Sequence, residues 1–248
     1  LVAKESMGEM ADIFNPETTE DGELNDQFAA KPLKADVNRV MTVAVVGAGS
    51  RGNTYARYAK KFPSVMKIVG AADINPVRLK KFAERYDLPA DKCFNSADEF
   101  FTVPKFADIV VISTPDDVHY VPTMKALQAG YHVLLEKPMC QTEKECRDIL
   151  EMTKKTGGLV AVCHVLRYAP YFMAMREVIK KGMIGDIVSV QHLEPIQYSH
   201  MAHSYVRGNW RSSKQTTPII LAKSCHDLDI IRYLVGKPCE TIVADGSL

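Results

Sequence analysis

A glycine-rich turn is the feature that most restricts how this chain can fold. The turn covers residues 47–52, Gly-Ala-Gly-Ser-Arg-Gly, and directly follows the apolar run Val-Ala-Val-Val at residues 43–46. An apolar run without alternation is typical of a parallel strand buried on both faces. The residues after the turn, 53–62, fit a helix. A strand, a tight turn and a helix in this order predict the first unit of an open parallel α/β sheet.

Further strands and helices alternate along the next hundred or so residues. Asn75 and Pro76 supply a helix N-cap and first-turn proline, and Thr142 with Glu145 forms a capping box. The strands are predicted at residues 67–72, 108–113, 133–136 and 159–164, and the helices at residues 76–86, 118–129 and 142–157. Residues 40–166 are therefore expected to form a doubly wound parallel sheet that binds its ligand at the carboxyl ends of the strands.

The glycine turn also predicts a dinucleotide site. The first glycine allows the tight turn, the second lets the backbone approach a pyrophosphate, and the third permits close packing of helix and strand. Asp73 follows Gly52 by 21 residues and ends the next predicted strand, so it is placed to accept a hydrogen bond from a ribose 2′-hydroxyl. A carboxylate there repels a 2′-phosphate, which favours NAD over NADP. The nearby Arg78 is nevertheless compatible with NADP. The alternative is a structural turn beside a surface aspartate.

The alternation ends after Arg167, where a second domain is expected to begin. Its predicted elements are a helix at residues 171–181, a strand at residues 187–192 and a helix at residues 218–234. These are too few strands for a closed layer. Residues 167–248 are therefore expected to be the incomplete start of a substrate and oligomerisation domain.

Residues 1–39 differ from the rest in composition. Residues 1–36 carry a net charge of −6, which leaves +7 on the remainder, and they contain neither the basic nor the apolar region of a secretory signal. We expect a weakly structured acidic arm. Because the first residue is Leu1 rather than methionine, the chain is expected to be a processed, tagged or partial form.

The composition of the whole chain excludes several classes of protein. A net charge of +1 gives no basic footprint for nucleic acid, and no apolar run reaches the ~20 residues that span a bilayer. The six cysteines are scattered without a Cys-x-x-Cys pair, which favours a reduced, cytoplasmic chain over a zinc knuckle or a redox motif. A small-molecule ligand is therefore expected, without a nucleic-acid or membrane partner.

A lysine ends the predicted strand at residues 133–136, within the sequence Glu136-Lys137-Pro138. This position places it at the carboxyl edge of the sheet, where a nicotinamide would lie. A lysine in a closed cleft can have its pKa lowered enough to transfer protons. The alternative is a solvated lysine at a strand end.

Five motifs together resemble the Gfo/Idh/MocA oxidoreductases, a family that includes glucose-fructose oxidoreductase and inositol dehydrogenase. The resemblance covers roughly residues 40–248 and, beyond the glycine turn, rests on Ser113-Thr114-Pro115 with His119, Glu136-Lys137-Pro138, residues 164–168, residues 208–211 and residues 223–229. It implies an N-terminal Rossmann domain and a C-terminal α/β domain with an open, mostly antiparallel sheet. It also implies NAD(P)-linked chemistry on CH–OH groups of sugars, cyclitols or related polyols, in a homo-dimer or tetramer formed through that sheet.

The resemblance implies catalytic roles for Lys137 and His226, which would handle the hydroxyl proton. Many members have aspartate four residues before this histidine, but here the position is Ala222. His226 is therefore expected to act alone, or with Lys137, Tyr198 or His203. With the glycine turn, the predicted cofactor-binding set is Gly47, Gly49, Ser50, Arg51, Gly52, Asp73, Thr114, Pro115, His119, Glu136, Lys137, Arg167, Trp210 and Arg211. For His119, a surface histidine at a helix N-terminus is an equal alternative.

The segment around residues 198–203 is predicted to bind substrate. Tyr198, His203 and His226 are the candidates, because aromatic rings stack on sugar faces and imidazoles hydrogen-bond hydroxyls. His200 and His203, three residues apart, could instead bind a metal with His226 as the third ligand. Hydrogen bonding to a polyhydroxylated substrate explains the segment without a metal, so no metal is expected.

These observations favour an NAD(P)-dependent oxidoreductase that moves a hydride between a polyol and a nicotinamide cofactor. One alternative keeps the cofactor but cleaves a glycosidic bond through transient oxidation. Another alternative is a non-catalytic NAD-binding regulator. The presence of Lys137 and His226 speaks against a regulator, whereas Ala222, in place of the usual aspartate, is compatible with one.

Overall fold

The computed structural model describes residues 39–212 and 216–246. The chain divides into two compact units, one formed by Lys34–Val235 and the other by Leu1–Leu33 with Gly236–Leu248. In the second unit, residues 236–246 are described and form neither helix nor strand. The acidic arm predicted at residues 1–39 lies outside the described residues except for Arg39. The domain division predicted at residues 166/167 falls inside the first unit and stays a prediction.

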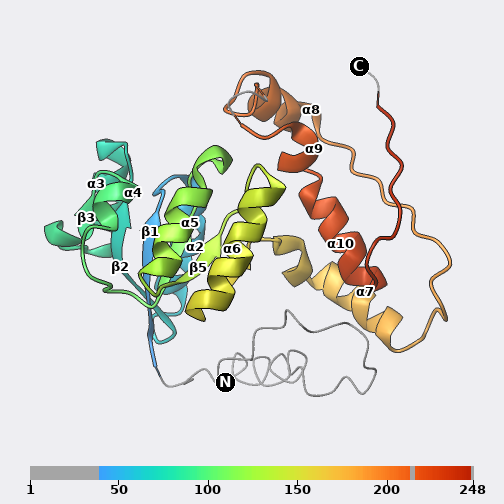
Figure 1. Cartoon of the computed structure of the whole chain (residues 1–248), viewed down its shortest axis with the longest axis horizontal. Coiled ribbons are helices and arrows are strands. Elements are labelled where there is room, and N and C mark those ends of the chain that lie inside the picture. Colours follow the sequence, from blue (N-terminus) through green and yellow to red (C-terminus); the bar gives the residue numbers. More distant parts are fainter. Residues whose placement is uncertain (1–38, 213–215, 247–248) are drawn as a thin grey trace. The chain divides into compact units, whose positions relative to one another are not determined.

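Six parallel strands form the sheet of the first unit, in the order β3-β2-β1-β4-β5-β6. All neighbouring strands pair in parallel, and the order reverses between β1 and β4. Figure 1 labels β1, β2, β3 and β5 of this sheet. The strands are β1 Met41–Val46, β2 Met66–Ala72, β3 Cys93–Phe94, β4 Ile109–Ile112, β5 His132–Leu135 and β6 Val160–Val162. This confirms the predicted doubly wound sheet, whose ligands bind where the strand order reverses.

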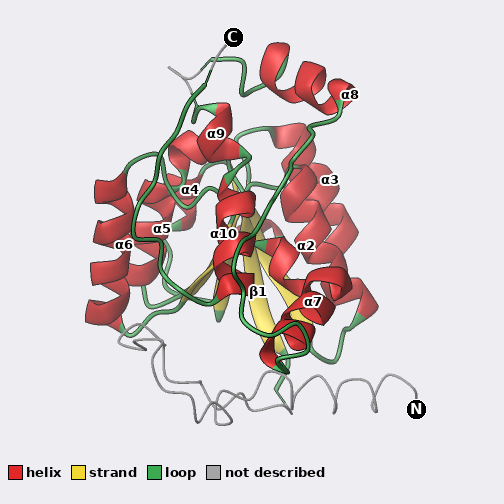
Figure 2. Ribbon diagram, turned by 90° about the vertical axis from the view of Figure 1, so that its right-hand side faces the viewer, coloured by secondary structure: helices red, strands yellow, loops and turns green. Residues whose placement is uncertain are grey.

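Helices cover both faces of the sheet (Figure 2). Val43 and Val45 of β1 pack into one apolar cluster, which the helices α2 and α3 complete, whereas Ala44 and Val46 pack into a second cluster with α4, α5 and α6. The bounds are α2 Ser50–Lys61, α3 Pro76–Tyr86, α4 Ala97–Phe100, α5 Tyr120–Gln128 and α6 Glu143–Thr156. Successive side chains of a strand point to opposite faces, which explains why β1 is apolar at every position from Val43 to Val46.

The predicted caps form as expected. The Asn75 side chain accepts hydrogen bonds from the N–H groups of Val77 and Arg78 at the start of α3. Thr142 and Glu145 form the reciprocal capping box of α6. α2 begins at Ser50 rather than at residue 53, so the second half of the glycine turn already belongs to the helix.

Three short elements between α3 and β4 were not predicted from the sequence. They are a 3-10 turn (η3, Ala90–Lys92), strand β3 and helix α4. Strand β3 has only two paired residues, Cys93 and Phe94. Two residues are too few to show a period, so no sequence pattern marks this strand.

Beyond β6 the described residues of the first unit form helices and loops. They comprise 3-10 helix η5 Val165–Tyr168, α7 Pro170–Lys180, α8 Tyr198–His200, π-helix η6 Met201–Val206, α9 Ile219–Ala222 and α10 Cys225–Val235. The strand predicted at residues 187–192 is wrong: this segment is irregular, with Val188 exposed by 95%. A β-strand is stabilised by hydrogen bonds to a neighbouring strand. Among the described residues after β6, no other strand is present to form them.

The single helix predicted at residues 218–234 is interrupted between α9 and α10. The Ala222 carbonyl accepts a hydrogen bond from Nζ of Lys137 at 2.8 Å. The N–H of His226 bonds instead to the carbonyl of Lys223 at 3.2 Å. The break therefore occurs where a side chain from the sheet takes a carbonyl that a continuous helix would use internally.

Candidate cofactor and active site

The glycine turn joins β1 to α2 at the carboxyl edge of the sheet. Gly47 has φ +97°, and a Cβ there would lie 2.7 Å from the carbonyl carbon of Ser113. A Cβ on Gly52 would lie 2.2 Å from the carbonyl oxygen of Gly47. Both positions therefore require glycine, the first for its backbone conformation and the second for the close packing of α2.

Gly49 differs from the other two glycines of the turn. A Cβ there would meet nothing within 4 Å, and φ is −74°. Gly49 is the N-cap of α2, no side chain caps it, and the first turn of the helix contains no acidic residue. An exposed helix N-terminus with free N–H groups suits the pyrophosphate of a dinucleotide, so the turn fits the predicted cofactor.

Thr114 and Pro115 follow β4 on the other side of the point where the strand order reverses. The Thr114 hydroxyl oxygen is buried without a hydrogen-bond partner among the described residues. A buried hydroxyl is normally paired, so this unpaired atom is a candidate to bind a ligand. Both residues stay in the predicted cofactor set.

His119 lies behind this turn, only 1% exposed. Its Nδ1 is 2.9 Å from the carbonyl oxygen of Pro138, and its Nε2 is 3.0 Å from that of Thr114. His119, which was predicted to bind the cofactor, thus holds the turn after β4 against the turn after β5.

Asp73 directly follows β2 and is 6% exposed. Its Oδ1 accepts hydrogen bonds from Nη2 of Arg78 at 2.9 Å and from the N–H of Asn75 at 2.7 Å. Nε of Arg78 lies 3.1 and 3.2 Å from the two carboxylate oxygens. The carboxylate predicted to bind a ribose is therefore already neutralised by a guanidinium.

Glu136 follows β5 and is 7% exposed. It accepts hydrogen bonds from the hydroxyl of Tyr55 and, at 2.9 Å, from the N–H of Lys137. Nε of Arg51 lies 3.8 Å from the same carboxylate. Burial and hydrogen bonds to Cys163 and Glu136 raise the pKa of Tyr55, so its hydroxyl stays protonated and donates. These contacts fix the backbone immediately before Lys137.

Lys137, which follows β5, lies close to the α9–α10 segment that carries His226. Nζ of Lys137 bonds to the Ala222 carbonyl, four residues before His226. Lys137 is close enough for its charge to contribute to lowering the pKa of His226. Ala222 thus supplies its main-chain carbonyl to the lysine, and α9, with the sequence Ile-Ile-Leu-Ala, provides no carboxylate to the histidine.

Burial is the largest cause that lowers the pKa of His226, and Lys137, His164 and Lys223 add to it. The pKa falls from 6.5 to about 4. Nδ1 of His226 is buried without a hydrogen-bond partner among the described residues. The ring of His164 lies edge-on at 5.9 Å. His226 is therefore neutral at pH 7 and can accept a proton.

Arg167 lies in η5, after β6, and binds α10. Its Nε and Nη2 lie 2.8 and 2.6 Å from the carboxylate of Asp229. The same carboxylate is 3.8 Å from Nδ1 of His164. Arg167, predicted to bind the cofactor, is thus part of an ion pair that connects η5 to the helix of His226.

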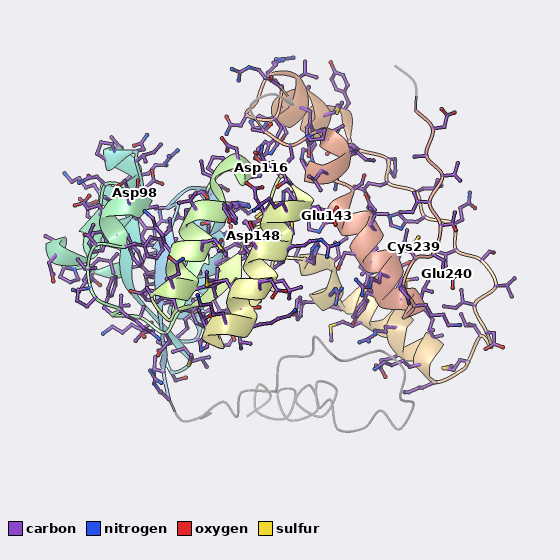
Figure 3. All side chains as sticks on the ribbon, in the orientation of Figure 1. Asp98, Asp116, Glu143, Asp148, Cys239 and Glu240 are labelled. Carbon is purple, nitrogen blue, oxygen red and sulfur yellow. The ribbon has the colours of Figure 1, made fainter. Side chains whose placement is uncertain are left out.

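Asp116 was missed by the sequence analysis, although it directly follows Pro115. Asp116, labelled in Figure 3, is 3% exposed. It accepts hydrogen bonds from the indole N–H of Trp210 at 3.2 Å, from the N–H of Thr217 at 3.2 Å and from the Thr217 hydroxyl. The donors follow Asp116 by 94 and 101 residues, so no local pattern signals them. Asp116 connects the turn after β4 to the segment before α9.

Two of the predicted substrate residues, Tyr198 and His203, lie at the surface. Tyr198 is 82% exposed, and His203 and Arg211 are also exposed. The Tyr205 ring is 6.1 Å from the ring of His200 and 6.5 Å from that of Trp210. These residues line one surface segment, and their contact with a substrate stays a prediction.

The metal set weighed from the sequence, His200 with His203 and His226, does not come together among the described residues. The described residues that could share an ion are His192, Glu194 and Asp227, with ligand atoms within 4.8 Å of one another. His192 is hydrogen-bonded to Asp227 at 3.0 Å, and Lys223 is paired with Glu194 at 2.6 Å. Their mutual contacts account for this group without a metal.

The fold and the site define an α/β protein with a dinucleotide-type glycine turn and with a lysine near a histidine at the edge of its sheet. The family model described as "Oxidoreductase family, NAD-binding Rossmann fold" matches residues 41–164. The model described as "Oxidoreductase family, C-terminal alpha/beta domain" matches residues 176–246. The chain therefore belongs to the Gfo/Idh/MocA oxidoreductase family, as the sequence motifs indicate.

Similar proteins include two from Bacillus subtilis (strain 168). YteT is 31% identical over 212 residues, which cover 82% of this chain and 49% of YteT. The scyllo-inositol 2-dehydrogenase (NADP(+)) IolW is 25% identical over 198 residues, which cover 79% of this chain and 52% of IolW. The chain thus spans about half the length of these curated relatives.

A solved structure shows the same fold. The crystal structure of scyllo-inositol dehydrogenase from Lactobacillus casei with bound cofactor NAD(H) and scyllo-inositol matches with a TM-score of 0.68 at 23% identity. The match covers 80% of this chain and 57% of that one.

Proposed function

We propose that this protein is an NAD(P)-dependent dehydrogenase that acts on a CH–OH group of a cyclitol, a sugar or a related polyol. The observation that carries the proposal is the pair formed by Lys137 and His226 at the carboxyl edge of β5. An ammonium group and a neutral, unpaired imidazole there lie beside a turn suited to a dinucleotide. Family membership and the inositol dehydrogenases among the similar proteins support the substrate class.

The residues around the glycine turn would hold the cofactor. The N–H groups at the start of α2 bind the pyrophosphate, and Asp73 accepts from a ribose hydroxyl, which supports NAD as a cofactor. When bound, the nicotinamide supplies the hydride acceptor of the reaction. IolW is named for NADP(+), so family membership alone does not decide between NAD and NADP.

Lys137 and His226 would manage the hydroxyl proton. The ammonium group of Lys137 donates a hydrogen bond to the substrate oxygen and orients the hydroxyl. His226 is neutral because burial and positive neighbours lower its pKa to about 4, so its free ring nitrogen accepts the proton as the carbonyl forms. Glu136 and Tyr55 hold the turn that carries the lysine.

The test combines the protein with NAD and a panel of cyclitols, sugars and glycosides, and follows the absorption band of the reduced nicotinamide. Accumulation of reduced cofactor together with an oxidised polyol supports a dehydrogenase. Cleavage of a glycoside without net reduced cofactor would instead support a glycosidase that uses transient oxidation. Cofactor binding without any absorbance change across the panel would contradict catalysis and support a regulator.

Location and assembly are part of the same proposal. All six cysteines are free thiols, which supports the reducing cytoplasm. Among residues 39–212 and 216–246, no helix is long and apolar enough to cross a membrane. Assembly as a dimer or tetramer through a C-terminal sheet stays a prediction, because the described residues beyond β6 form no strand.

A further inference from the structure

Two cysteines come together at the start of α6, shortly after the turn that carries Lys137. Cys140 lies three residues after Lys137 and is 3% exposed, and Cys146, in the first turn of α6, is partly exposed. The thiol of Cys140 donates a hydrogen bond to the sulfur of Cys146. Cys140 belongs to an apolar cluster of the sheet, and Cys146 packs against that cluster. The two sulfur atoms are therefore direct neighbours, although five residues separate the cysteines in sequence.

Hydrogen bonds of the main chain hold both segments in place. The N–H of Cys146 bonds to the carbonyl of Thr142 at 3.2 Å, and the Thr142 hydroxyl donates to the Glu145 carboxylate at 3.0 Å. On the other segment, the carbonyl oxygen of Pro138 lies 2.9 Å from Nδ1 of His119. The fold itself therefore determines the contact between the two thiols.

This contact gives the two thiols different reactivity. Hydrogen bonds from the thiol and the N–H of Cys140 lower the pKa of Cys146. Burial and the nearby carboxylates of Glu143 and Glu145 oppose this shift only in part. The hydrogen bond to Cys146 and burial raise the pKa of Cys140. Because the thiolate is the nucleophilic form of cysteine, Cys146 is suited to attack an oxidant and Cys140 to react in a second step.

We propose that Cys140 and Cys146 are a redox-active dithiol that a hydroperoxide oxidises to an intramolecular disulfide. The sulfur of Cys146 attacks one oxygen of the peroxide, so an S–O bond forms and the O–O bond breaks. The leaving oxygen takes up the proton of the Cys146 thiol and departs as an alcohol or, from hydrogen peroxide, as water.

The second step closes the disulfide. The sulfur of Cys140 attacks the sulfur of Cys146, an S–S bond forms, and the S–O bond breaks. The hydroxyl group leaves as water with the thiol proton of Cys140. The two thiols together lose two electrons, which the peroxide takes up. The disulfide joins the start of α6 to the turn that carries Lys137.

The proposal goes beyond the dehydrogenase function, because neither the nucleotide nor the polyol takes part in these steps. All six cysteines are free in the structure, and a reducing compartment keeps such a pair reduced until an oxidant is present. The sequence contains no Cys-x-x-Cys motif, so only the fold identifies the pair.

The experiment treats the folded protein with hydrogen peroxide, blocks the remaining thiols with iodoacetamide and maps the unreduced tryptic peptides by mass spectrometry. Trypsin cleaves after Lys144, between the two cysteines, and not after Lys137, which precedes proline. The disulfide therefore joins two separate peptides, residues 126–144 and residues 145–147. We expect the joined peptides to appear with peroxide and to disappear after treatment with a dithiol reductant.

Cys93 is the matched control thiol, because it is also partly exposed, whereas burial and Asp91 raise its pKa. At limiting peroxide and pH 7, we expect Cys146 to be oxidised at least about tenfold faster than Cys93. Cys93→Ser should form the joined peptides as the unsubstituted protein does, and Cys146→Ser should abolish them and leave Cys140 reduced. In Cys140→Ala, Cys146 should instead gain oxygen as sulfenic and sulfinic acid, because the second thiol is missing.

Absence of the joined peptides from the folded protein would overturn the proposal, as would their formation only after unfolding in urea. Equal oxidation of Cys93 and Cys146 would also contradict it, because the contact with Cys140 would then give no special reactivity. Circular dichroism verifies that each variant is folded. If Cys140→Ala does not fold, because Cys140 is buried, Cys146→Ser at the partly exposed position still decides the question.

Discussion

At the scale of single residues, His226 shows how position sets chemical state. Burial alone disfavours the imidazolium, and the positive charges of Lys137 and Lys223 act in the same direction. The two carboxylates on the same helix are directed elsewhere, since Asp229 pairs with Arg167 and Asp227 with His192. Without an acidic partner, His226 is neutral at pH 7.

This environment predicts a pH dependence of folding stability. The folded-state pKa of His226, about 4, lies below its ordinary value of 6.5, so the unfolded chain binds more protons between these values. The stability that neutral His226 provides is fully present above about pH 6.5 and is lost as the pH falls towards 4. Urea unfolding should show a loss of about 1–2 kcal/mol between pH 7.5 and pH 5 from this group.

His226→Gln tests the source of that loss, because glutamine does not titrate. We expect the variant to have a flatter dependence of the free energy of unfolding on pH, whereas His200→Gln, at an exposed position, should retain the original slope. Burial also lowers the pKa of His164, so some dependence remains in His226→Gln. An unchanged slope in His226→Gln would show that this histidine is protonated alike in both states.

Local sequence identifies some of the candidate site residues but not their partners. The glycines and Asp73 follow from spacing, and Lys137 and His226 from the resemblance of their motifs. The roles of Asp116 and Tyr55 are not predicted from local sequence, because their partners lie 81 to 101 residues away. Such contacts depend on the order of the strands in the sheet, which cannot be derived from local patterns in a single sequence.

At the scale of elements, the glycine turn contains one glycine that the fold requires, Gly52, and one that we expect the ligand to require, Gly49. Gly52→Ala should destabilise the protein by about 1–3 kcal/mol, because its Cβ would overlap the Gly47 carbonyl oxygen. Gly49→Ala should change stability by less than about 0.5 kcal/mol yet weaken the binding of NAD, because the methyl group would point into open space where we place the pyrophosphate. Thermal unfolding and calorimetry measure the two effects.

The two variants serve as controls for each other, because each adds one methyl group to the glycine turn. Equal destabilisation by the two variants would contradict the distinction between the glycines. Unchanged NAD affinity in Gly49→Ala would contradict the placement of the pyrophosphate.

The pair of Arg167 and Asp229 connects η5 to α10 and should contribute to stability. The Arg167 side chain is 40% exposed, so solvent weakens the attraction. We expect a double-mutant cycle with Arg167→Ala and Asp229→Ala to give a coupling of about 1 kcal/mol. Additive effects of the two substitutions would show that the contact does not hold α10 in place.

Elements with strong periodicity are the ones that the sequence predicts. The helices α3 and α6 have clear caps, and β1 has an uninterrupted apolar run. The strand predicted at residues 187–192 has a suitable composition but no partner in the described chain. Pairing is a property of two segments, so composition alone does not decide it.

At the scale of the whole chain, the sheet brings residues from distant segments to one edge. The turns after β1, β2, β4 and β5 carry the glycine turn, Asp73, Thr114 and Lys137, because parallel strands place their carboxyl ends together. The helix α10 adds His226 to the same region through the contact between Lys137 and Ala222. The candidate site therefore depends on a contact between the sheet and a segment beyond it.

The most direct test of the account compares the protein with its Lys137→Met variant, loaded with NAD and a polyol substrate found in the panel. We expect the variant to bind NAD with an affinity within about threefold of the original, while the rate of cofactor reduction falls by a factor of about 10² or more. Cofactor reduction at an unchanged rate in the variant would contradict the central claim that Lys137 acts in the reaction.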